Sequence, residues 1–372
     1  MRILTVSHFY EAHGGGLERV AGQLCREFAA AGHDAVWVAS DADAPPLGAI
    51  SALSVGAITA LSVGAITALP LRCVNPTERL TGLPMPIPGW RGLRALWHEV
   101  GRSDIVIVHD SLYVTSICAM LAARLQRRKV VLIQHIAGIA FSSALLRGIM
   151  ALANLLVTRP MLRAADRLVF ISDTVRRDLL GDPARRDYRL VFNGVDRAVF
   201  YPAATPQQSA PPILFVGRYV EKKGLAVIRA LAMLRPDLTF YLAGSGPISP
   251  SGWGLANVRD LGPQTPQALA NLYRSAALLL LPSVGEGYPL VIQEAMACGL
   301  PVICGQPSNR ADPAAAQWLT GVAIDLGDPD GSALRCADAI TGLRIDSEGR
   351  VAMADYAAGA YSWQAMAKAV LE

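Results

Sequence analysis

Short hydrophobic runs alternate with longer amphipathic stretches along the chain, and this pattern predicts an α/β fold. In the first half a helical pattern runs from Leu17 to about Ala31, where Gly32 ends it, and another lies near 112–126. Strand-like runs flank these helices, as in parallel sheets that helices cover on both faces. The runs are RILTV (2–6), DAVWVAS (34–40), DIVIVHD (104–110), KVVLIQH (129–135), RLVFIS (167–172) and YRLVFNG (188–194).

A proline-rich, polar stretch, YPAATPQQSAPP (201–212), precedes a second α/β series. Helices are expected after Lys223, near 266–275 and across 289–298, between the runs ILFVG (213–217), LTFYLAG (238–244), LLLLP (278–282) and PVICG (301–305). We therefore expect two doubly wound, Rossmann-like domains, 1–200 and 212–355, joined by a linker at 201–211. Because ligands bind beyond the carboxyl ends of parallel strands, the domains should face each other across a cleft that holds the active site.

The uncharged segment 47–71 interrupts this alternation. It contains the octapeptide SVGAITAL twice in tandem, at 54–61 and 62–69. Its length alone would span a bilayer. However, Ser, Gly and Thr fill three of every eight positions, and a period of eight fits neither a solenoid nor a heptad. We interpret the segment as an in-frame duplication accommodated in a loop beside the first domain's sheet.

A second apolar stretch, 136–167, is interrupted by polar residues and does not predict a membrane span. As a helix pair it is amphipathic, with Arg147, Arg159, Arg163 and Arg167 on the polar face. Such a surface suits peripheral contact with an anionic membrane. A helix that faces the core and has a polar back fits the pattern equally well.

Composition indicates an ordinary globular protein, because 52% of the 372 residues are hydrophobic and 17% are charged. The net charge of +4 gives no reason to expect nucleic acid, but the charge is uneven. Residues 1–200 carry 22 Lys and Arg against 16 Asp and Glu, and the remainder carries 12 against 14. A basic first half suits a phosphorylated substrate or an acidic membrane face, and equally an arginine-rich surface.

The cysteines and the N-terminal sequence indicate the cellular compartment in which the protein is expected. The six cysteines form no CxxC pair and no metal-ligand spacing, and no signal-peptide segment opens the chain. We expect a reduced, cytoplasmic location, with any membrane contact at the inner face of the plasma membrane.

Three stretches with candidate ligand-binding residues follow strand ends. At Gly14-Gly15-Gly16 the backbone can approach a ligand closely, and the helix that follows favours a phosphate. The stretch lacks GxGxxG spacing, and a plain tight turn fits it as well. In GRYVEKKG (217–224), Arg218 and Lys223 flank a strand-to-helix turn and are suited to clamp a diphosphate. A solvated basic turn is the alternative.

The third stretch, GEGYPLVIQEAMACGLPVI (285–303), contains Glu286 and Glu294. Two carboxylates that flank one bond indicate glycoside hydrolysis. Here Glu286 lies in a turn, whereas Glu294 lies more than one turn into a helix that begins near Pro289, so one bond cannot lie between them. The arrangement favours one carboxylate near a sugar and the other at the ribose hydroxyls of a nucleotide.

These motifs together resemble those of the large retaining glycosyltransferase family 4, which has the GT-B fold. Order and spacing agree along nearly the whole chain except 47–71. The matching motifs are Gly14-Gly15-Gly16, Ala165-Asp166 before Ile171-Ser172, Asn193-Gly194-Val195-Asp196, Gly217-Arg218 to Lys223-Gly224, Ala243-Gly244-Ser245-Gly246-Pro247, and Glu286 with Glu294 followed by Ala295-Met296-Ala297-Cys298-Gly299. The final stretch, 356–372, resembles the family's closing helix, which crosses back to the first domain and would couple the domains during closure.

The resemblance implies roles in donor binding. In such enzymes the residues matching Arg218 and Lys223 neutralise the diphosphate of a UDP- or GDP-linked sugar, on which charge builds as the glycosidic bond breaks. Glu286 would contact the donor sugar and Glu294 the ribose. Pro289 stands where the family commonly has a glycine, which removes one amide contact. The further donor-binding positions are Gly15, Gly16, Gly217, Gly246, Gly287, Tyr288 and Leu290.

His135, which ends KVVLIQH, matches a family histidine near the transferred sugar, and with Glu286, Arg218 and Lys223 it completes the candidate catalytic set. His109 and Gly14 are candidates for binding the acceptor. Because cations stand in for a metal, no divalent ion and no cofactor beyond the nucleotide-sugar co-substrate is expected. The departing phosphate can itself take the acceptor's proton in a front-face displacement.

The resemblance thus predicts a metal-independent, retaining hexosyltransferase. Its acceptor would be a glycan or a polyprenyl-linked glycan in cell-envelope polysaccharide assembly (lipopolysaccharide, capsule or exopolysaccharide). A nucleotide-sugar epimerase or a glycosidase, and a non-catalytic sugar-nucleotide-binding protein, are the alternatives. The complete set of Arg218, Lys223, Glu286 and Glu294 argues against the non-catalytic alternative.

Overall fold

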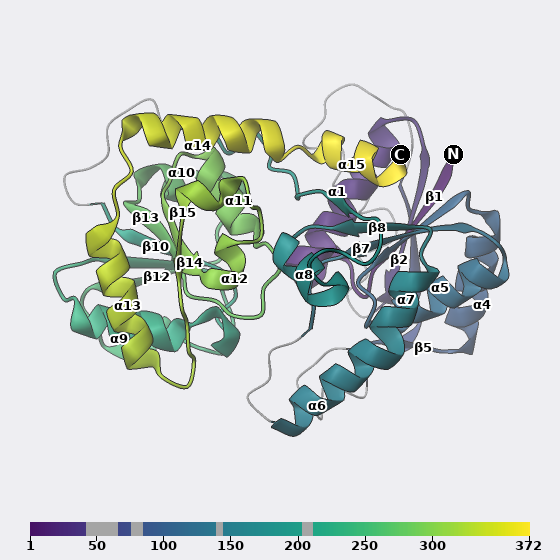
Figure 1. The fold of residues 1–372 in the computed structure, drawn as a ribbon, viewed down its shortest axis with the longest axis horizontal. Helices are drawn as coiled ribbons and strands as arrows, with labels where there is room; N and C mark the ends of the chain where they lie inside the picture. The colour runs from purple at the N-terminus through teal and green to yellow at the C-terminus, as the bar shows by residue number, and fades with distance from the viewer. Residues whose placement is uncertain (42–65, 76–84, 139–143, 203–210) are drawn as a thin grey trace. The chain divides into compact units, whose positions relative to one another are not determined.

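The computed structural model describes residues 1–41, 66–75, 85–138, 144–202 and 211–372, and these form two compact units (Figure 1). Unit 1 comprises Met1–Ile171, Val175–Val191 and Trp363–Glu372, and unit 2 comprises Ser172–Thr174 and Phe192–Ser362. Apart from Ser172–Thr174, the chain enters unit 2 at Phe192 and returns to unit 1 at Trp363, whereas the predicted boundaries are 200 and 356. Residues 203–210 of the predicted linker lie outside the described residues.

Unit 1 is built on a seven-stranded parallel sheet in the order β3-β2-β1-β6-β7-β8-β9. Its strands are β1 (Arg2–Val6), β2 (Asp34–Ser40), β3 (Thr67–Leu71), β6 (Ile105–His109), β7 (Lys129–Gln134), β8 (Arg167–Phe170) and β9 (Arg189–Leu190). Between β3 and β6 the chain also forms a short antiparallel pair, β4 (Cys73–Val74) and β5 (Ile87–Pro88). The central strands are buried on both faces, which explains their continuous apolar sequences.

Helices cover both faces of this sheet (Figure 1). The helices of the first part of the chain are η1 (Glu11–His13), α1 (Gly16–Ala30), α4 (Trp90–Arg102), α5 (Val114–Leu125), α6 (Ala144–Ala153), η3 (Asn154–Thr158), α7 (Arg159–Ala164) and α8 (Asp173–Leu180), and α15 (Trp363–Leu371) joins them from the C-terminus. α1 packs against α15, and α4 packs against α5. Arg167 and Arg189 donate hydrogen bonds to the carbonyls of Val370 and Ala369, at 2.8 and 2.9 Å. These two arginines satisfy carbonyls at the end of α15 and hold it on unit 1.

The loop predicted for 47–71 is wrong at its C-terminal end. Thr67–Leu71 forms β3, which pairs in parallel with β2 at the edge of the sheet. An edge strand has a neighbour on one side only and tolerates Pro70, so its sequence need not look like a buried strand. Residues 42–65, which hold the first octapeptide copy, lie outside the described residues.

The stretch from α6 through η3 to α7 is helical (Figure 1), but its exposed face differs from the predicted one. Arg159 and Arg163 are exposed as expected. Arg167 is not on that face, because it begins β8 and its guanidinium binds α15. The side chain of Arg147 lies outside the described residues. Among the described residues, no helix combines the length and the apolar sequence that a membrane crossing requires.

Unit 2 has a six-stranded parallel sheet in the order β12-β11-β10-β13-β14-β15. Its strands are β10 (Ile213–Val216), β11 (Phe240–Ala243), β12 (Val258–Gly262), β13 (Leu278–Leu281), β14 (Val302–Gly305) and β15 (Leu319–Val322). Its helices are η4 (Glu221–Lys223), α9 (Leu225–Leu234), η5 (Pro250–Trp253), α10 (Pro266–Ser275), α11 (Leu290–Ala297), α12 (Gln306–Asn309), η6 (Ala315–Trp318), α13 (Pro329–Gly342) and α14 (Ser347–Ala360). α9 packs with α13 and α11 with α14. The two parallel α/β units confirm the predicted fold class.

Each sheet has one place at which the strand order reverses. In unit 1 it lies between β1 and β6, and in unit 2 it lies between β10 and β13. Open parallel sheets bind ligands at the carboxyl ends of the strands at such a switch point. The residues that follow these four strands are therefore the candidates for function.

Candidate functional sites

The switch point of unit 2 joins two of the predicted residues in an ion pair. Lys223, at the end of η4, places its Nζ 2.9 Å from Oε2 of Glu286, which follows β13. Lys222 Nζ lies 3.3 Å from the other carboxylate oxygen. Burial of Glu286 opposes its ionisation, but the two ammonium groups outweigh this effect and hold the pKa of the carboxyl below its usual range. The carboxylate is therefore charged at neutral pH.

A glycine allows these two loops to meet. Gly224 has φ +75°, and a Cβ on it would lie 2.1 Å from the carbonyl oxygen of Pro282 at the end of β13. In addition, Val284 N–H donates to the Lys222 carbonyl at 2.9 Å. Any other residue at 224 would force the loops apart and separate Lys223 from Glu286.

Arg218 and the glycines near it form the other side of this switch point. Arg218 is exposed, and its side chain has no ion-pair or hydrogen-bond partner among the described residues. A Cβ on Gly244 would lie 1.9 Å from the Gly217 carbonyl oxygen, and a Cβ on Gly246 would lie 2.5 Å from the carbonyl oxygen of Tyr219. Gly246 is thus required for close packing of the two loops that follow β10 and β11, whether or not a ligand touches it.

Glu294 has surroundings different from those of Glu286. It lies on α11, its residue is 2% exposed, and Oε2 accepts a hydrogen bond from Tyr273 on α10 at 3.1 Å. Because the two glutamates bind different elements, they do not form one acid–base pair. The contact of Glu294 with a ribose stays a prediction. Leu290 begins α11 and is half-buried, and Gly287 before it is buried.

The side chain of Tyr288 belongs to the core of unit 2. Its hydroxyl lies 2.8 Å from that of Tyr361, which donates to Asp312 Oδ2 at 2.9 Å. Because Tyr361 has one hydroxyl proton, Tyr288 is the donor in the bond between the two tyrosines. Burial raises the pKa of both phenols, so both stay protonated. A ligand can therefore meet Tyr288 through its backbone alone.

The switch point of unit 1 gathers buried polar side chains from three strand ends. His109 ends β6, and His135 follows β7. Nδ1 of His109 lies 3.0 Å from Nε2 of His135. Burial lowers the pKa of both rings, that of His135 to about 3, so both are neutral at physiological pH. His135 can thus act as a hydrogen-bonding group but not as a cation.

Asp110 fixes the backbone of His135. Its Oδ1 accepts hydrogen bonds from the N–H groups of His135 and Ile136, at 2.7 and 3.3 Å. Asp110 has φ +54°, a conformation that non-glycine residues seldom adopt. Burial raises the pKa of its carboxyl to about 7.

The three glycines after β1 have three different surroundings. Gly14 ends η1 with φ +79°, and neither Gly14 nor Gly16 has an atom within 4 Å of an added Cβ. A Cβ on Gly15, in contrast, would lie 2.1 Å from Oε2 of Glu18. The start of α1, where a phosphate was expected, therefore already has the carboxylate of Glu18 against it. Glu18 Oε1 lies 3.0 Å from His8 Nε2.

His8, Glu18, Asp110 and Tyr113 were not among the predicted site residues. The strand-end rule that selects the glycines also selects His8 and Asp110, since each closely follows a buried strand. Glu18 and Tyr113 have no such signal, because they lie within or before helices. Three of them are in contact, because His8 pairs with Glu18 and stacks on Tyr113 with 3.7 Å between ring centroids.

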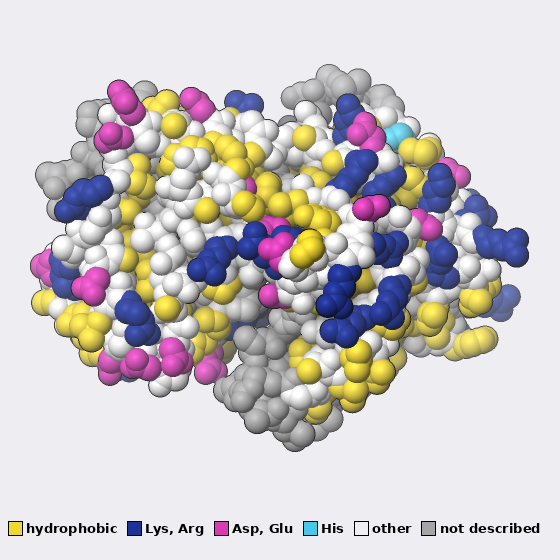
Figure 2. Space-filling model, viewed as in Figure 1, with side chains coloured by type: hydrophobic (Ala, Val, Ile, Leu, Met, Phe, Trp, Pro, Cys, Tyr) yellow, Lys and Arg dark blue, Asp and Glu magenta, His cyan; other side chains and the backbone are white. Residues whose placement is uncertain are grey.

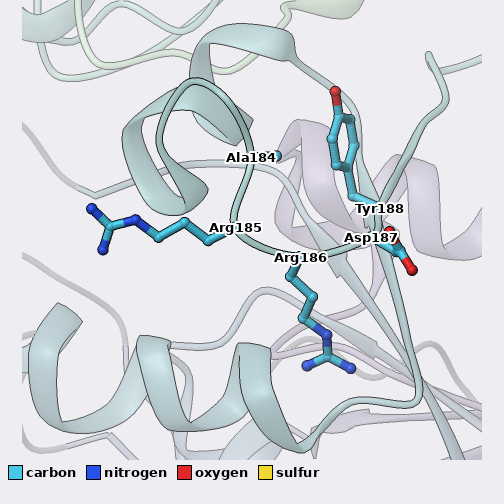
Figure 3. Close-up of a pocket in the computed structure, with 5 residues that line it drawn as sticks. All are labelled: Ala184, Arg185, Arg186, Asp187 and Tyr188. Atoms are coloured by element: carbon cyan, nitrogen blue, oxygen red, sulfur yellow. The ribbon is translucent and has the colours of Figure 1, made fainter.

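A pocket of about 520 Å³ lies at the loop before β9. This loop does not follow any of the four strands that form the two switch points. Its lining residues are Ala184, Arg185, Arg186, Asp187 and Tyr188. Figure 3 shows that the two arginines, Asp187 and Tyr188 diverge rather than converge on one point. Arg186 is bound to the carbonyls of Leu162 and Ala165. We therefore do not assign this pocket as the site of the chemistry.

The fold and the two switch points define a protein of the GT-B class. The chain superposes on a sucrose-phosphate synthase from Thermosynechococcus elongatus with a TM-score of 0.73 at 19% identity, covering 99% of this chain and 97% of the other. It also superposes on a structure assigned as a UDP-N-acetylglucosamine 2-epimerase from Listeria monocytogenes, with a TM-score of 0.54 at 15% identity, covering 100% and 94%. At these identities the likeness shows the fold alone.

Sequence comparison identifies the family. Glycosyltransferase Family 4 matches residues 14–199, and Glycosyl transferases group 1 matches residues 210–341. The chain belongs to glycosyltransferase family 4, which confirms the predicted resemblance. It is 34% identical over 187 residues to a D-inositol 3-phosphate glycosyltransferase from Corynebacterium urealyticum, covering 44% of this chain and 42% of the relative. The chain spans about half the length of the curated relatives it matches.

Proposed function

We propose that this protein transfers a hexose from a nucleotide diphosphate sugar to a hydroxyl acceptor, with retention of configuration. The observation that supports this proposal most is the cationic switch point of unit 2, where Lys223 pairs with the ionised Glu286 and the exposed Arg218 follows the neighbouring strand β10. A departing diphosphate gains charge in the transition state, and cations held in place stabilise it. Two such cations take the place of a divalent ion in this proposal.

Each site residue then has a role. The exposed guanidinium of Arg218 binds one phosphate in a bidentate manner. The ammonium group of Lys223 donates hydrogen bonds both to Glu286 and to the second phosphate. Glu286 contacts the donor sugar, Glu294 the ribose, and the amides of Gly287 and Leu290 add hydrogen bonds to the phosphate or the sugar. In a front-face displacement the departing phosphate takes the acceptor's proton.

His135 contributes as a neutral hydrogen-bonding group to the transferred sugar. Its ring is fixed by His109 and its backbone by Asp110. Since burial keeps its pKa at about 3, it does not titrate in the working range. The rate should therefore show no pH dependence that arises from His135.

A screen of donors tests the proposal. Thermal shift with UDP-, GDP- and ADP-sugars identifies the base, and the anomeric configuration of the product is then read by NMR. We expect one donor class to raise the melting temperature, an axial product from an axial donor, and full activity in EDTA. A product of inverted configuration would contradict the retaining mechanism. Loss of activity in EDTA would contradict metal independence.

The acceptor is proposed in two alternatives. The curated relatives are named for D-inositol 3-phosphate, and the basic first half of this chain suits such a phosphorylated acceptor. A polyprenyl-linked glycan of the cell envelope is the second alternative. Transfer to each, measured in parallel with the same donor, separates them.

One feature of unit 1 favours a membrane-bound acceptor and a peripheral position on the inner face of the plasma membrane. Four apolar side chains along α6 and η3 are exposed: Ile149 (54%), Leu152 (54%), Leu155 (51%) and Leu156 (63%). Figure 2 shows hydrophobic area beside Lys and Arg side chains in the part that Figure 1 labels α6 and α7. Arg159 and Arg163 supply exposed positive charge on the same helical stretch.

Sedimentation with vesicles tests this contact. Vesicles that contain phosphatidylglycerol should retain the wild type, and vesicles of phosphatidylcholine alone should retain less. The double variant Leu152→Glu/Leu156→Glu should lose retention, whereas Leu334→Glu, at an exposed leucine of α13, should keep it. Equal retention of all three proteins would contradict the proposal.

An epimerase or a glycosidase is the competing function, because the GT-B fold also occurs in a structure assigned as an epimerase. Incubation with the donor alone distinguishes them. A transferase leaves most of the donor intact, whereas an epimerase forms the epimer and a glycosidase rapidly releases free sugar.

A further inference from the structure

The pair of His8 and Glu18 at the switch point of unit 1 has no role in the donor site of unit 2. His8 lies two residues after β1, and Glu18 lies in the first turn of α1. The residues are 5% and 2% exposed, and His8 Nε2 lies 3.0 Å from Glu18 Oε1. Burial of a carboxylate costs free energy that pairing with an imidazole only partly offsets, so the pair calls for a functional explanation.

The charge of Glu18 sets the tautomer of His8. Burial opposes the ionisation of Glu18, but its contacts with His8, chiefly the hydrogen bond, outweigh this effect and lower the pKa of the carboxyl. An ionised carboxylate only accepts hydrogen bonds, so the proton of a neutral His8 ring lies on Nε2. Nδ1 is then a lone-pair acceptor.

That acceptor is unused within the protein. His8 Nδ1 is buried and has no hydrogen-bond partner among the described residues. The ring cannot turn easily to find one, because it stacks on Tyr113 with an interplanar angle of 5°. His109 Nε2 is also without a partner in the described part of the chain, but that ring is fully buried and no carboxylate of that part bonds to it.

We propose that His8 Nδ1 accepts a hydrogen bond from a hydroxyl of the acceptor substrate, and that Glu18 positions the ring for this bond. A lone pair beside a buried carboxylate accepts from a neutral donor and repels an anion. The group that binds there is therefore an uncharged hydroxyl, and where the acceptor is phosphorylated its phosphate lies elsewhere. This inference rests on the proposed transferase function, and it assigns the acceptor hydroxyl to unit 1.

Gly15 belongs to the same arrangement. Its missing Cβ leaves the space that Oε2 of Glu18 fills. Gly15 thus contributes to acceptor binding indirectly, because it leaves room for the carboxylate that positions His8.

The tautomer provides a test that needs no substrate. In ¹⁵N-histidine-labelled protein, long-range proton–nitrogen spectra at pH 7.5 should show His8 with a protonated Nε2 and a bare Nδ1. Glu18→Gln should weaken this preference, and millimolar myo-inositol or D-inositol 3-phosphate should shift the Nδ1 resonance. A protonated Nδ1, or no shift with either polyol, would overturn the proposal.

Kinetics with D-inositol 3-phosphate provide the second test. His8→Gln should lower kcat/KM for the acceptor at least tenfold and leave the Kd for UDP unchanged. His98→Gln, at an exposed histidine of α4, is the matched control and should change neither. Equal acceptor kcat/KM in His8→Gln and His98→Gln would overturn the inference. A wild type that binds none of the UDP-, GDP- and ADP-sugars would instead overturn the proposed function, and the tautomer would still decide the role of His8.

Discussion

Lys223 Nζ lies 2.9 Å from Glu286 Oε2, although the two residues are 63 positions apart in the sequence. Both are predicted donor-site residues, and in the structure each satisfies the other. A diphosphate that binds Lys223 must therefore share it with Glu286. This competition makes the two side chains separable by experiment.

Glu286→Gln should raise the affinity for UDP while it lowers the rate of sugar transfer. The substitution frees Lys223 for the diphosphate, and we expect a gain of about three- to tenfold, which corresponds to an interaction of about 1 kcal/mol. Transfer falls because the sugar loses its carboxylate contact. Calorimetry with UDP and a steady-state transfer assay measure the two effects.

Lys222→Ala is the matched control for this prediction. Lys222 lies 3.3 Å from the same carboxylate, but its side chain is 51% exposed, so its removal should change UDP affinity little. Weaker UDP binding in Glu286→Gln than in the wild type would show that Glu286 supports rather than competes for Lys223.

Gly15→Ala and Gly16→Ala should differ although the residues are adjacent. An added Cβ at 15 would lie 2.1 Å from Glu18 Oε2, whereas one at 16 has nothing within 4 Å. Gly15→Ala should lower the melting temperature, because Glu18 must leave His8. Gly16→Ala should keep the wild-type melting temperature, so any loss of donor binding in it reports a ligand that approaches the backbone. Equal melting temperatures in both variants would contradict this view of Gly15.

Asp110→Asn should make the protein more stable at pH 8. Burial raises the pKa of Asp110 to about 7 in the folded state, while the unfolded carboxyl ionises near pH 4. Between these values the folded state binds the extra proton, so the free energy of unfolding decreases as the pH rises from about 4 to 7. Asparagine keeps the acceptor oxygen for His135 and has no charge to bury.

Urea unfolding at pH 5 and pH 8 measures this difference. We expect the wild type to lose more than about 1 kcal/mol relative to Asp110→Asn over this range, since one pKa unit corresponds to ~1.4 kcal/mol. An equal pH dependence of wild type and variant would contradict a protonated Asp110.

Tyr361→Phe should destabilise unit 2 by about 1–3 kcal/mol, because it removes two buried hydrogen bonds, the one that Tyr361 donates to Asp312 and the one that it accepts from Tyr288. Tyr188→Phe is the control, since Tyr188 is 37% exposed. Urea unfolding of the two variants gives the comparison. A loss no greater than that of the control would show that the buried hydroxyls are satisfied otherwise.

Interior strands were predictable from the sequence and edge strands were not. β1, β6, β10 and β13 have neighbours on both sides, and burial on both faces makes them continuous apolar runs. The edge strands β3, β12 and β15 escaped prediction, because an edge strand mixes polar residues and proline into its sequence. At the fourth edge, β9 is only two residues long where 188–194 was expected.

The site was predictable one strand end at a time. The strand-end rule selects Arg218, Lys223 and Glu286 from sequence, since each follows a buried strand of unit 2. The ion pair between Lys223 and Glu286 depends on the close approach of two loops at Gly224, which no local pattern encodes. For the same reason the sequence does not reveal that Tyr288 turns into the core.

We propose that unit 2 binds a nucleotide sugar through Arg218 and Lys223, and calorimetric titration with the donor that stabilises the protein tests this binding site. The double variant Arg218→Ala/Lys223→Ala should bind at least about a hundredfold more weakly, because two charge-assisted contacts worth ~1.5–3 kcal/mol each are lost. Arg229→Ala, at an exposed arginine of α9, should bind like the wild type. An unchanged affinity in the double variant would contradict the donor site.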